Sequence, residues 1–234
     1  MGIGSGSAVQ SSGERAIFSI LKKKAKPPYC LFDVGSNEGQ FLRVLLASVG
    51  PQDISVHCFE PCQRASAILT AAFGEDRRIH VNNIGIGREG GRTTLYYDRV
   101  GSGLASLTKR RLDHFGVSFD EAEEIDVTTI DAYCLENRIS RIHLLKLDIE
   151  GHELDALAGA KGMLASNSVD MVTFEFGGCN IDTRTFFQDY WYFFQDRKMR
   201  LFRMTPSGYF SPIRAYRESD EQFITTNYLA MSER

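Results

Sequence analysis

Short apolar runs alternate with helix-like segments along most of this 234-residue chain, and this alternation limits the possible fold more than any other feature. A short apolar run bounded by turn residues predicts a buried strand, and apolar residues recurring three and four apart predict an amphipathic helix. The first such block contains predicted strands at 30–34, 55–59 and 78–84 and helices at 37–49 and 62–73. Strands joined by helices in this way are typical of an α/β fold with a parallel sheet.

The same alternation resumes in the last third of the chain. Strands are predicted at 142–147 and 171–176, and helices at 153–164 and 183–196. Three more segments are expected to close the sheet as strands: 198–204, 209–213 and 223–230. Because no linker separates these segments, we expect residues 14–234 to form one domain.

The middle and the beginning of the chain differ from this pattern. Strands predicted at 93–97 and 124–130 flank a polar stretch, which we interpret as a small β/loop insertion around 93–130 or a lid. Residues 1–13 are rich in Gly and Ser and are expected to be disordered, whereas 14–24 have the pattern of a short amphipathic helix.

Composition excludes several classes of protein. A hydrophobic share of 43% excludes a disordered chain, and a net charge of −3 gives no general attraction to nucleic acid. The five cysteines are too scattered for a disulfide framework. Two of them lie four positions apart, but no second Cys/His pair completes a zinc site. No apolar stretch approaches the ~18–20 residues of a membrane span. We therefore expect a cytoplasmic protein that does not bind nucleic acid and does not insert into membranes.

Two strand ends carry the signs of a nucleoside site. The first strand runs into 33–39 (DVGSNEG), where glycines permit a sharp turn and the following helix offers free N–H groups. The second strand ends at Glu60, which in a doubly wound sheet can accept both ribose hydroxyls. The simpler alternative is a helix-capping glycine and a surface glutamate. Asn37 breaks the G-x-G-x-x-G pattern of dinucleotide folds, so the turn favours S-adenosylmethionine over a pyrophosphate.

A second group of polar residues follows the strand at 142–147. Lys146, Asp148 and Glu150 alternate along the chain, which would place their side chains on one face if the strand continued. The alternative is a capping cluster for the next helix, which concerns Glu150 and His152 most. An Asp148/Glu150 pair could also hold a divalent metal, but too few further oxygen ligands are present to prefer a metal site.

Taken in order, several motifs resemble the FkbM-type S-adenosylmethionine-dependent methyltransferases. They are DVGSNEG at 33–39, FEP at 59–61, NIGIG at 83–87, LKLDIEGHE at 145–153, LAGA at 157–160 and FEF at 174–176. The resemblance covers roughly residues 30–177 and implies a class I methyltransferase: a Rossmann-like, doubly wound, mostly parallel seven-stranded sheet whose last strand is antiparallel. It also implies O-methylation of a hydroxyl on a sugar, glycan or natural product.

The resemblance further implies roles for individual residues. Gly35 and Gly39 would line the methionine end of the cofactor, Glu60 would hold the ribose, Asn83 would lie near the adenine and Asp148 near the amine. The full predicted cofactor-binding set is Asp33, Gly35, Ser36, Asn37, Gly39, Glu60, Pro61, Asn83 and Asp148. No metal is expected to be required.

Transfer to a hydroxyl also needs a base, because the acceptor must lose its proton. The candidates are Asp148, Glu150, His152 and Glu175; Glu150 or His152 is favoured, since Asp148 is expected to serve the cofactor. The predicted substrate-binding residues are Ser102, Ser106, Lys109 and Glu175. The loop carrying the first three either closes over the acceptor or is a solvated surface loop.

Some alternatives stay open on the sequence alone. The aromatic residues of 186–194 predict a buried helix or a homodimer interface, or else a stacking wall for the acceptor. The other candidate functions are an N-methyltransferase acting on a small molecule, a nicotinamide-dependent oxidoreductase and a non-catalytic S-adenosylmethionine-binding module.

Overall fold

In a computed structural model of the chain, the described residues are 3–4, 6, 12–49, 53–99 and 101–233. The helices are α1 (Arg15–Lys24), α2 (Gln40–Val49), α3 (Gln63–Phe73), α4 (Ile130–Glu136), α5 (Glu153–Ala158), α6 (Lys161–Ala165), α7 (Cys179–Thr183) and α8 (Phe187–Asp196), with 3-10 turns at Asp113–Phe115 and Glu218–Asp220. The strands are β1 (Tyr29–Val34), β2 (Ile54–Phe59), β3 (Ile79–Asn82), β4 (Gly85–Ile86), β5 (Gly91–Tyr97), β6 (Glu121–Thr128), β7 (Leu144–Leu147), β8 (Met171–Phe176), β9 (Met199–Met204), β10 (Phe210–Ile213) and β11 (Thr226–Ser232).

The main sheet has eight strands in the order β10-β9-β11-β8-β7-β1-β2-β3. The pairs joining β8, β7, β1, β2 and β3 are parallel, whereas β11 runs antiparallel to both β8 and β9. The α/β fold and the antiparallel last strand are therefore confirmed. The expected number of seven strands is wrong by one, because the segment at 210–213 pairs with the free edge of β9 as an additional antiparallel strand.

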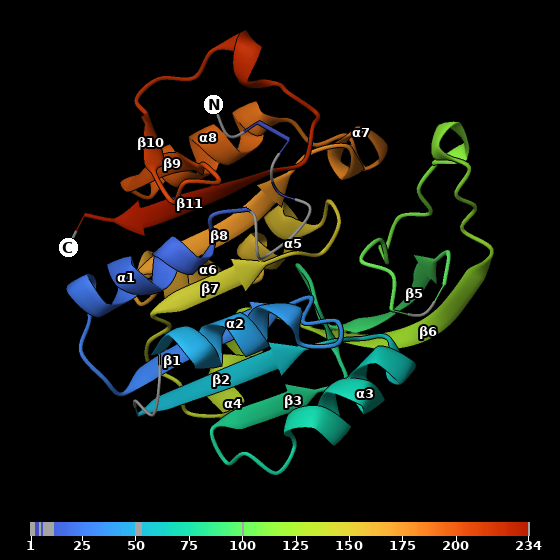
Figure 1. Cartoon of the computed structure of the whole chain (residues 1–234), viewed down its shortest axis with the longest axis horizontal. Helices are drawn as coiled ribbons and strands as arrows, with labels where there is room; N and C mark the ends of the chain where they lie inside the picture. The colour runs from blue at the N-terminus through green and yellow to red at the C-terminus, as the bar shows by residue number, and fades with distance from the viewer. Residues whose placement is uncertain (1–2, 5, 7–11, 50–52, 100, 234) are drawn as a thin grey trace.

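Helices cover both faces of the sheet (Figure 1). The first face packs against α1, α2 and α3 through a core that includes Phe18, Leu42 and Leu69. The opposite face packs against α4, α5, α6 and α8 through a second core that includes Tyr133 and Leu157. Two separate hydrophobic cores explain why the strands between them read as continuous apolar runs.

The aromatic helix α8 belongs to the second core. Phe187, Tyr190 and Phe194 are buried, and the Tyr190 ring stacks on Phe174 of β8 with centroids 4.6 Å apart. Phe186 and Tyr192 remain exposed. The buried-helix interpretation is therefore confirmed, while a homodimer interface stays a prediction.

The predicted insertion contributes β5 and β6 to a second, three-stranded sheet, which also includes β4 and has the order β4-β6-β5. Residues 101–120, between β5 and β6, lie beside the carboxyl ends of the main strands (Figure 1, green), and we call them the lid. A bridge between Tyr96 and Ser106 fastens the start of the lid to β5. The lid therefore lies where it would cover a ligand bound at this edge of the sheet.

Two predicted helices differ in extent from the prediction. The segment at 153–164 breaks into α5 and α6 around Gly159, whose carbonyl accepts the Asp131 N–H while the Asp131 carboxylate caps α6 at Gly162 and Met163. The helix predicted at 183–196 begins later, at Phe187, because Arg184 has a left-handed φ of 58° and ends the preceding short helix α7. In both places a local hydrogen bond or turn outweighs the helical pattern.

The N-terminal segment is only partly described. The Gly6 N–H donates to the Thr225 carbonyl at 3.1 Å, and Ser12 is buried. Most of the predicted disorder falls on residues 1–2, 5 and 7–11, which lie outside the described residues, so that expectation stays a prediction. None of the helices formed by the described residues is both long enough and apolar enough to cross a lipid bilayer.

Candidate active site

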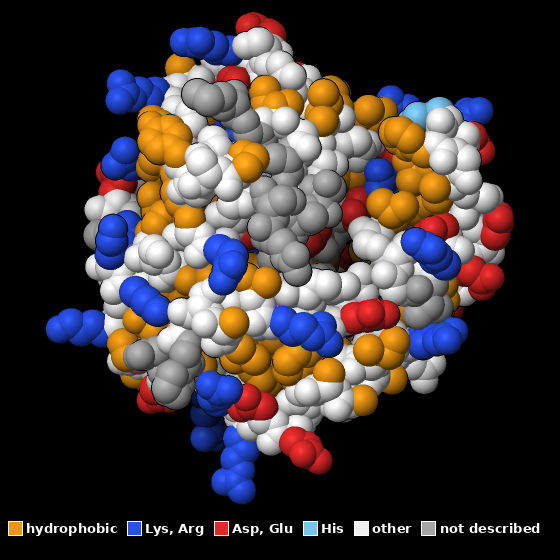
Figure 2. Space-filling model, viewed as in Figure 1, with side chains coloured by type: hydrophobic (Ala, Val, Ile, Leu, Met, Phe, Trp, Pro, Cys, Tyr) orange, Lys and Arg blue, Asp and Glu red, His pale blue; other side chains and the backbone are white. Residues whose placement is uncertain are grey.

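A cavity of about 1130 Å³ opens at the carboxyl ends of β1, β2, β7 and β8 and is bounded on one side by the lid. Figure 2 shows the surface hollowed beside the hydrophobic side chains of the lid. Typical small-molecule sites measure about 300–1,000 Å³. This cavity is therefore large enough to hold two ligands at once.

Most of the residues singled out from the sequence line this cavity. They are Gly35, Ser36, Asn37, Glu60, Pro61, Ser102, Ser106, Asp148, Glu150, His152 and Glu175. The exceptions are Asp33, Gly39, Asn83 and Lys109. Parallel strands bring their carboxyl ends to one edge, which is why residues more than 100 positions apart meet here.

The turn after β1 joins three strand ends. The Gly35 and Ser36 N–H groups both donate to the Phe59 carbonyl, at 3.0 and 3.1 Å. Gly35 has a φ of 81°, and a Cβ at this position would lie 1.9 Å from the Asp148 carbonyl oxygen. Glycine is therefore required where the turn after β1 passes the end of β7. This close contact sets the distance between the turn after β1 and the turn after β7.

Glu60 is buried at the end of β2 and anchors the same turn. Its carboxylate accepts the N–H groups of Asn37 at 2.8 Å and Cys62 at 2.9 Å. Burial raises the pKa of Glu60 to about 7, although these two hydrogen bonds oppose the shift. Each carboxylate oxygen keeps a further lone pair for a ligand.

Lys146 lies at the centre of a buried charge cluster. Its Nζ is 3.3 Å from Asp33 Oδ1 and 3.0 Å from Asp148 Oδ2, and it also lies over the Phe41 ring. Burial raises the pKa of Asp33, and the charge of Lys146 opposes this shift. Asp33 is thus the internal partner of Lys146 and does not line the cavity, whereas the Asp148 side chain is 40% exposed toward it.

Glu14 is a cavity residue that the sequence did not reveal. It is buried just before α1, accepts a hydrogen bond from Ser12 at 2.8 Å and faces the charge of Lys146. Nothing in the local sequence distinguishes this glutamate from an ordinary helix-capping residue.

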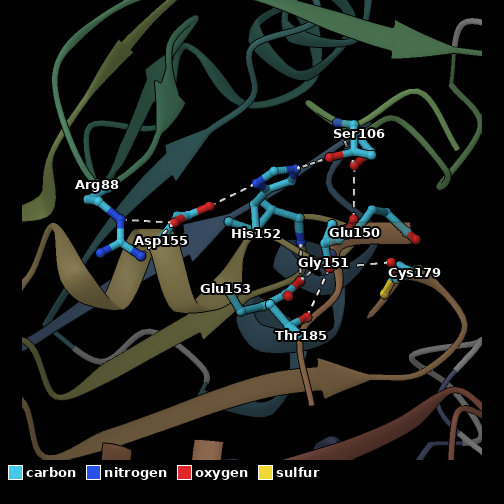
Figure 3. A network of polar contacts seen from close by, with 12 residues as sticks. Arg88, Ser106, Glu150, Gly151, His152, Glu153, Asp155, Cys179 and Thr185 are labelled. Carbon is cyan, nitrogen blue, oxygen red and sulfur yellow. Dashed lines mark hydrogen bonds and ion pairs between the residues drawn. The ribbon is translucent and has the colours of Figure 1, made fainter. Parts of the chain in front are cut away.

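The turn after β7 is held in a strained conformation. Glu150 has a φ of 53° and Gly151 a φ of 101°. The buried Glu153 accepts the Ile149 N–H at 3.1 Å and the Gly151 N–H at 3.2 Å (Figure 3). Left-handed backbone at a non-glycine residue persists only where its surroundings impose it, and such strain is concentrated at functional sites.

His152 has a partner at each ring nitrogen. Nδ1 lies 3.0 Å from Asp155 Oδ2 and Nε2 lies 3.0 Å from Thr108 Oγ1 of the lid. Arg88 pairs with the same Asp155 carboxylate, which gives the chain of contacts in Figure 3. His152 therefore connects α5 to the lid.

Arg110 of the lid contacts two acidic side chains of the cavity wall. It is buried, forms a close ion pair with Glu150, and lies 3.5 Å from Asp182 of α7. Ser106 donates to the Glu150 carbonyl at 2.9 Å, so two lid residues fix Glu150. The sequence prediction chose the neighbouring Lys109 instead, which is exposed and does not line the cavity.

The remaining predicted residues have structural contacts. Asn83 is exposed and donates to the carbonyls of Glu60 and Pro61, at 2.9 and 2.8 Å. Gly39 packs on α3, where a Cβ would lie 2.7 Å from the Phe73 ring. Ser102 donates to the Asp98 carboxylate within the lid region. Because Asn83 and Gly39 do not line the cavity, their cofactor roles stay predictions.

Comparison with known families identifies the chain. The Methyltransferase FkbM domain matches residues 33–201, which is more than half of the sequence and includes the ends of β1, β2, β7 and β8. The chain belongs to the FkbM methyltransferase family. The family resemblance seen in the sequence motifs is thereby confirmed.

Two similar proteins extend this result. The 2-O-methyltransferase NoeI of Sinorhizobium fredii (strain NBRC 101917 / NGR234) is 28% identical over 159 residues, which are 64% of this chain and 63% of NoeI. The crystal structure of methyltransferase FkbM from Methylobacillus flagellatus KT aligns with a TM-score of 0.54 and 17% identity, over 92% of this chain and 47% of that one. The second likeness supports the fold alone. This chain spans less than two thirds of either protein.

Proposed function

We propose that this FkbM-family chain is an S-adenosylmethionine-dependent methyltransferase acting on a hydroxyl of a sugar, glycan or similarly hydroxylated small molecule. The observation that carries the proposal is the placement of Glu60 and Asp148, at the ends of β2 and β7, on either side of the Gly35 turn in one cavity. Two carboxylates so placed suit the ribose and the amine of this cofactor.

The other cavity residues also suit this cofactor. The Oδ1 of Asn37 is buried and, among the residues that the structure describes, receives no hydrogen bond. It is therefore available to a donor on the ligand. Apolar side chains beyond β2 offer a surface for an adenine ring, namely Ile84, Ile86, Leu95 and Ile125.

The protein has little chemistry to supply for such a transfer. Bound here, the cofactor would provide a methyl group already activated by a positively charged sulfur. The chain has to hold the acceptor oxygen in line, exclude water and accept one proton. The lid contacts of Ser106 and Arg110 with Glu150 support the first two tasks, because they close the acceptor side of the cavity.

Oxygen is favoured as the acceptor atom for two reasons. The acceptor side is lined by hydrogen-bonding groups, among them Glu150, Glu175 and Ser106. The name of the similar protein NoeI describes methylation at oxygen. The acid-rich wall also suits an amine, so N-methylation is the second candidate.

We expect the purified chain to transfer labelled methyl groups from S-adenosylmethionine to one or more members of a panel of glycosides. The panel pairs each glycoside with its deoxy analogue and with the corresponding amino sugar. Labelling that disappears in the deoxy analogue supports O-methylation. Labelling confined to amino sugars would replace the proposal with N-methylation, and no labelling with either set would contradict the proposed acceptor class.

A further inference from the structure

Glu175 is a cavity carboxylate that faces the acceptor side. It lies on β8 next to the turn that carries Glu150 and opposite Asn227 of β11. One carboxylate oxygen of Glu175, one of Glu150 and the sulfur of Cys179 all lie within 4.8 Å of one another. Because Glu150 lies where the lid closes the cavity, Glu175 is within reach of an acceptor held under the lid.

The other candidates for a base are already engaged. Asp148 is paired with Lys146, and Glu150 with Arg110. Both ring nitrogens of His152 have partners. Within the described ranges 12–49, 53–99 and 101–233, no hydrogen bond or ion pair reaches the Glu175 side chain. A ligand can thus approach this carboxylate without displacing a protein contact.

The charges around Glu175 come from several elements. Asp148 and Glu150 face it from the turn after β7, and Glu153 from α5. Lys146 of β7 is the cation whose charge acts on it directly, while Arg110 of the lid is committed to Glu150. The thiol of Cys179 in α7 completes the surroundings. Burial first, and then the charges of Asp148, Glu150 and Glu153, raise the pKa of Glu175 well above its usual range.

We propose that Glu175 is the base that takes the proton of the acceptor hydroxyl, and that the positive charge of bound S-adenosylmethionine keeps it ionised until transfer. This inference rests on the proposed function. In the reaction, the acceptor oxygen forms a bond to the methyl carbon, and the electron pair of the broken carbon–sulfur bond stays on sulfur. The hydroxyl proton moves to a Glu175 carboxylate oxygen, so that one positive and one negative charge disappear together.

A consequence is that binding of the methyl donor favours the ionised form of the base. Burial and the neighbouring acids favour the protonated form of Glu175, and a cationic ligand favours the ionised form. S-adenosylhomocysteine lacks the sulfonium charge but shares the ribose and amine, so it leaves the proton in place. The difference in proton release between the two ligands therefore reports on Glu175. It does not report on Glu60, because the predicted ribose contact of Glu60 is the same for both ligands.

Proton release on binding tests the inference without any acceptor. Calorimetry at about pH 6.5, in buffers of different ionisation enthalpy, measures the protons released by each ligand. We expect S-adenosylmethionine to release more protons than S-adenosylhomocysteine does. Glu175→Gln should abolish that difference, and Glu136→Gln, an exposed carboxylate on α4, should retain it. A difference that persists in Glu175→Gln would overturn the inference while leaving the proposed function intact.

Two further readouts complete the test. With an acceptor from the glycoside panel, Glu175→Gln should lower kcat by about 10²–10⁴-fold, and S-adenosylhomocysteine affinity should stay within about twofold of wild type. The variant should also be at least as stable as wild type at neutral pH, because a buried carboxyl group with a raised pKa destabilises the fold as pH rises. An unchanged kcat would overturn the inference. Failure of both ligands to bind wild type would overturn the proposed function and this inference with it.

Discussion

Lys146→Met is expected to destabilise the protein more than any other single change in the charge cluster. The substitution leaves Asp33, whose side chain is 1% exposed, without the ion pair that spans 3.3 Å. Breaking a buried pair by removing one partner costs about 3–5 kcal/mol. For a chain of this size that corresponds to a fall in Tm of roughly 6–20 °C, measurable by calorimetric or fluorescence melting.

The loss should depend on pH in a defined direction. Burial already raises the pKa of Asp33. Without Lys146, this pKa rises further above the value of about 3.9 that an aspartate has in an unfolded chain. Stability from a raised carboxyl pKa is present below that unfolded value and is lost as pH rises. The difference between wild type and Lys146→Met should therefore be smallest near pH 4 and grow toward pH 7.

A double variant provides the matched control. Lys146→Met combined with Asp33→Asn removes both charges of this buried pair and should recover much of the lost stability, since Asp33 is then no longer an unpaired buried charge. If the single and the double variant lost the same amount, the cluster would be held by packing alone and the ion-pair explanation would be wrong.

Glu60→Gln is expected to weaken S-adenosylhomocysteine binding by about 10–100-fold. The substitution replaces one acceptor oxygen with an NH₂ group, and a hydrogen bond to a charged group contributes about 1.5–3 kcal/mol. It also removes one of the two acceptors that fix the Asn37 and Cys62 N–H groups. Titration calorimetry measures this loss directly.

The pH dependence of binding separates Glu60 from other contributions. Because burial raises the pKa of Glu60 to about 7, the carboxyl group is protonated below that pH, and ribose hydroxyls prefer the ionised form as acceptor. Wild-type affinity should therefore be about tenfold weaker at pH 6 than at pH 8. Glu60→Gln should lose most of this dependence, and Glu136→Gln should keep it. Equal pH profiles for wild type and Glu60→Gln would contradict the placement of the ribose.

The sequence predicted which residues meet in the cavity where these residues follow strand ends. Gly35, Glu60 and Asp148 each follow a short apolar strand, and parallel strands must bring such positions to one edge. The lid was also predictable as a polar break between two strands. These inferences require only local sequence patterns and the predicted order of strands and helices, and both can be obtained from the sequence.

The sequence could not predict contacts that depend on how loops fold back. Arg110 and Lys109 are adjacent in one polar loop, and only the turn of that loop directs Arg110 to Glu150 and leaves Lys109 in solvent. Glu14 reaches the cavity because α1 packs on the sheet, which no motif announces. The extra strand β10 was recognisable as a strand, but its addition to the sheet edge was not implied by the family resemblance.

The most direct test of the account is the affinity of the wild-type protein for S-adenosylhomocysteine, measured by titration calorimetry with NAD in a parallel titration. The cavity with Glu60 and Asp148 predicts micromolar binding of S-adenosylhomocysteine at about pH 8, and the turn with Asn37 in place of a glycine predicts no binding of NAD. Binding of NAD alone would assign the cavity to a dinucleotide. No binding of either ligand by the folded protein would contradict the proposed methyltransferase function.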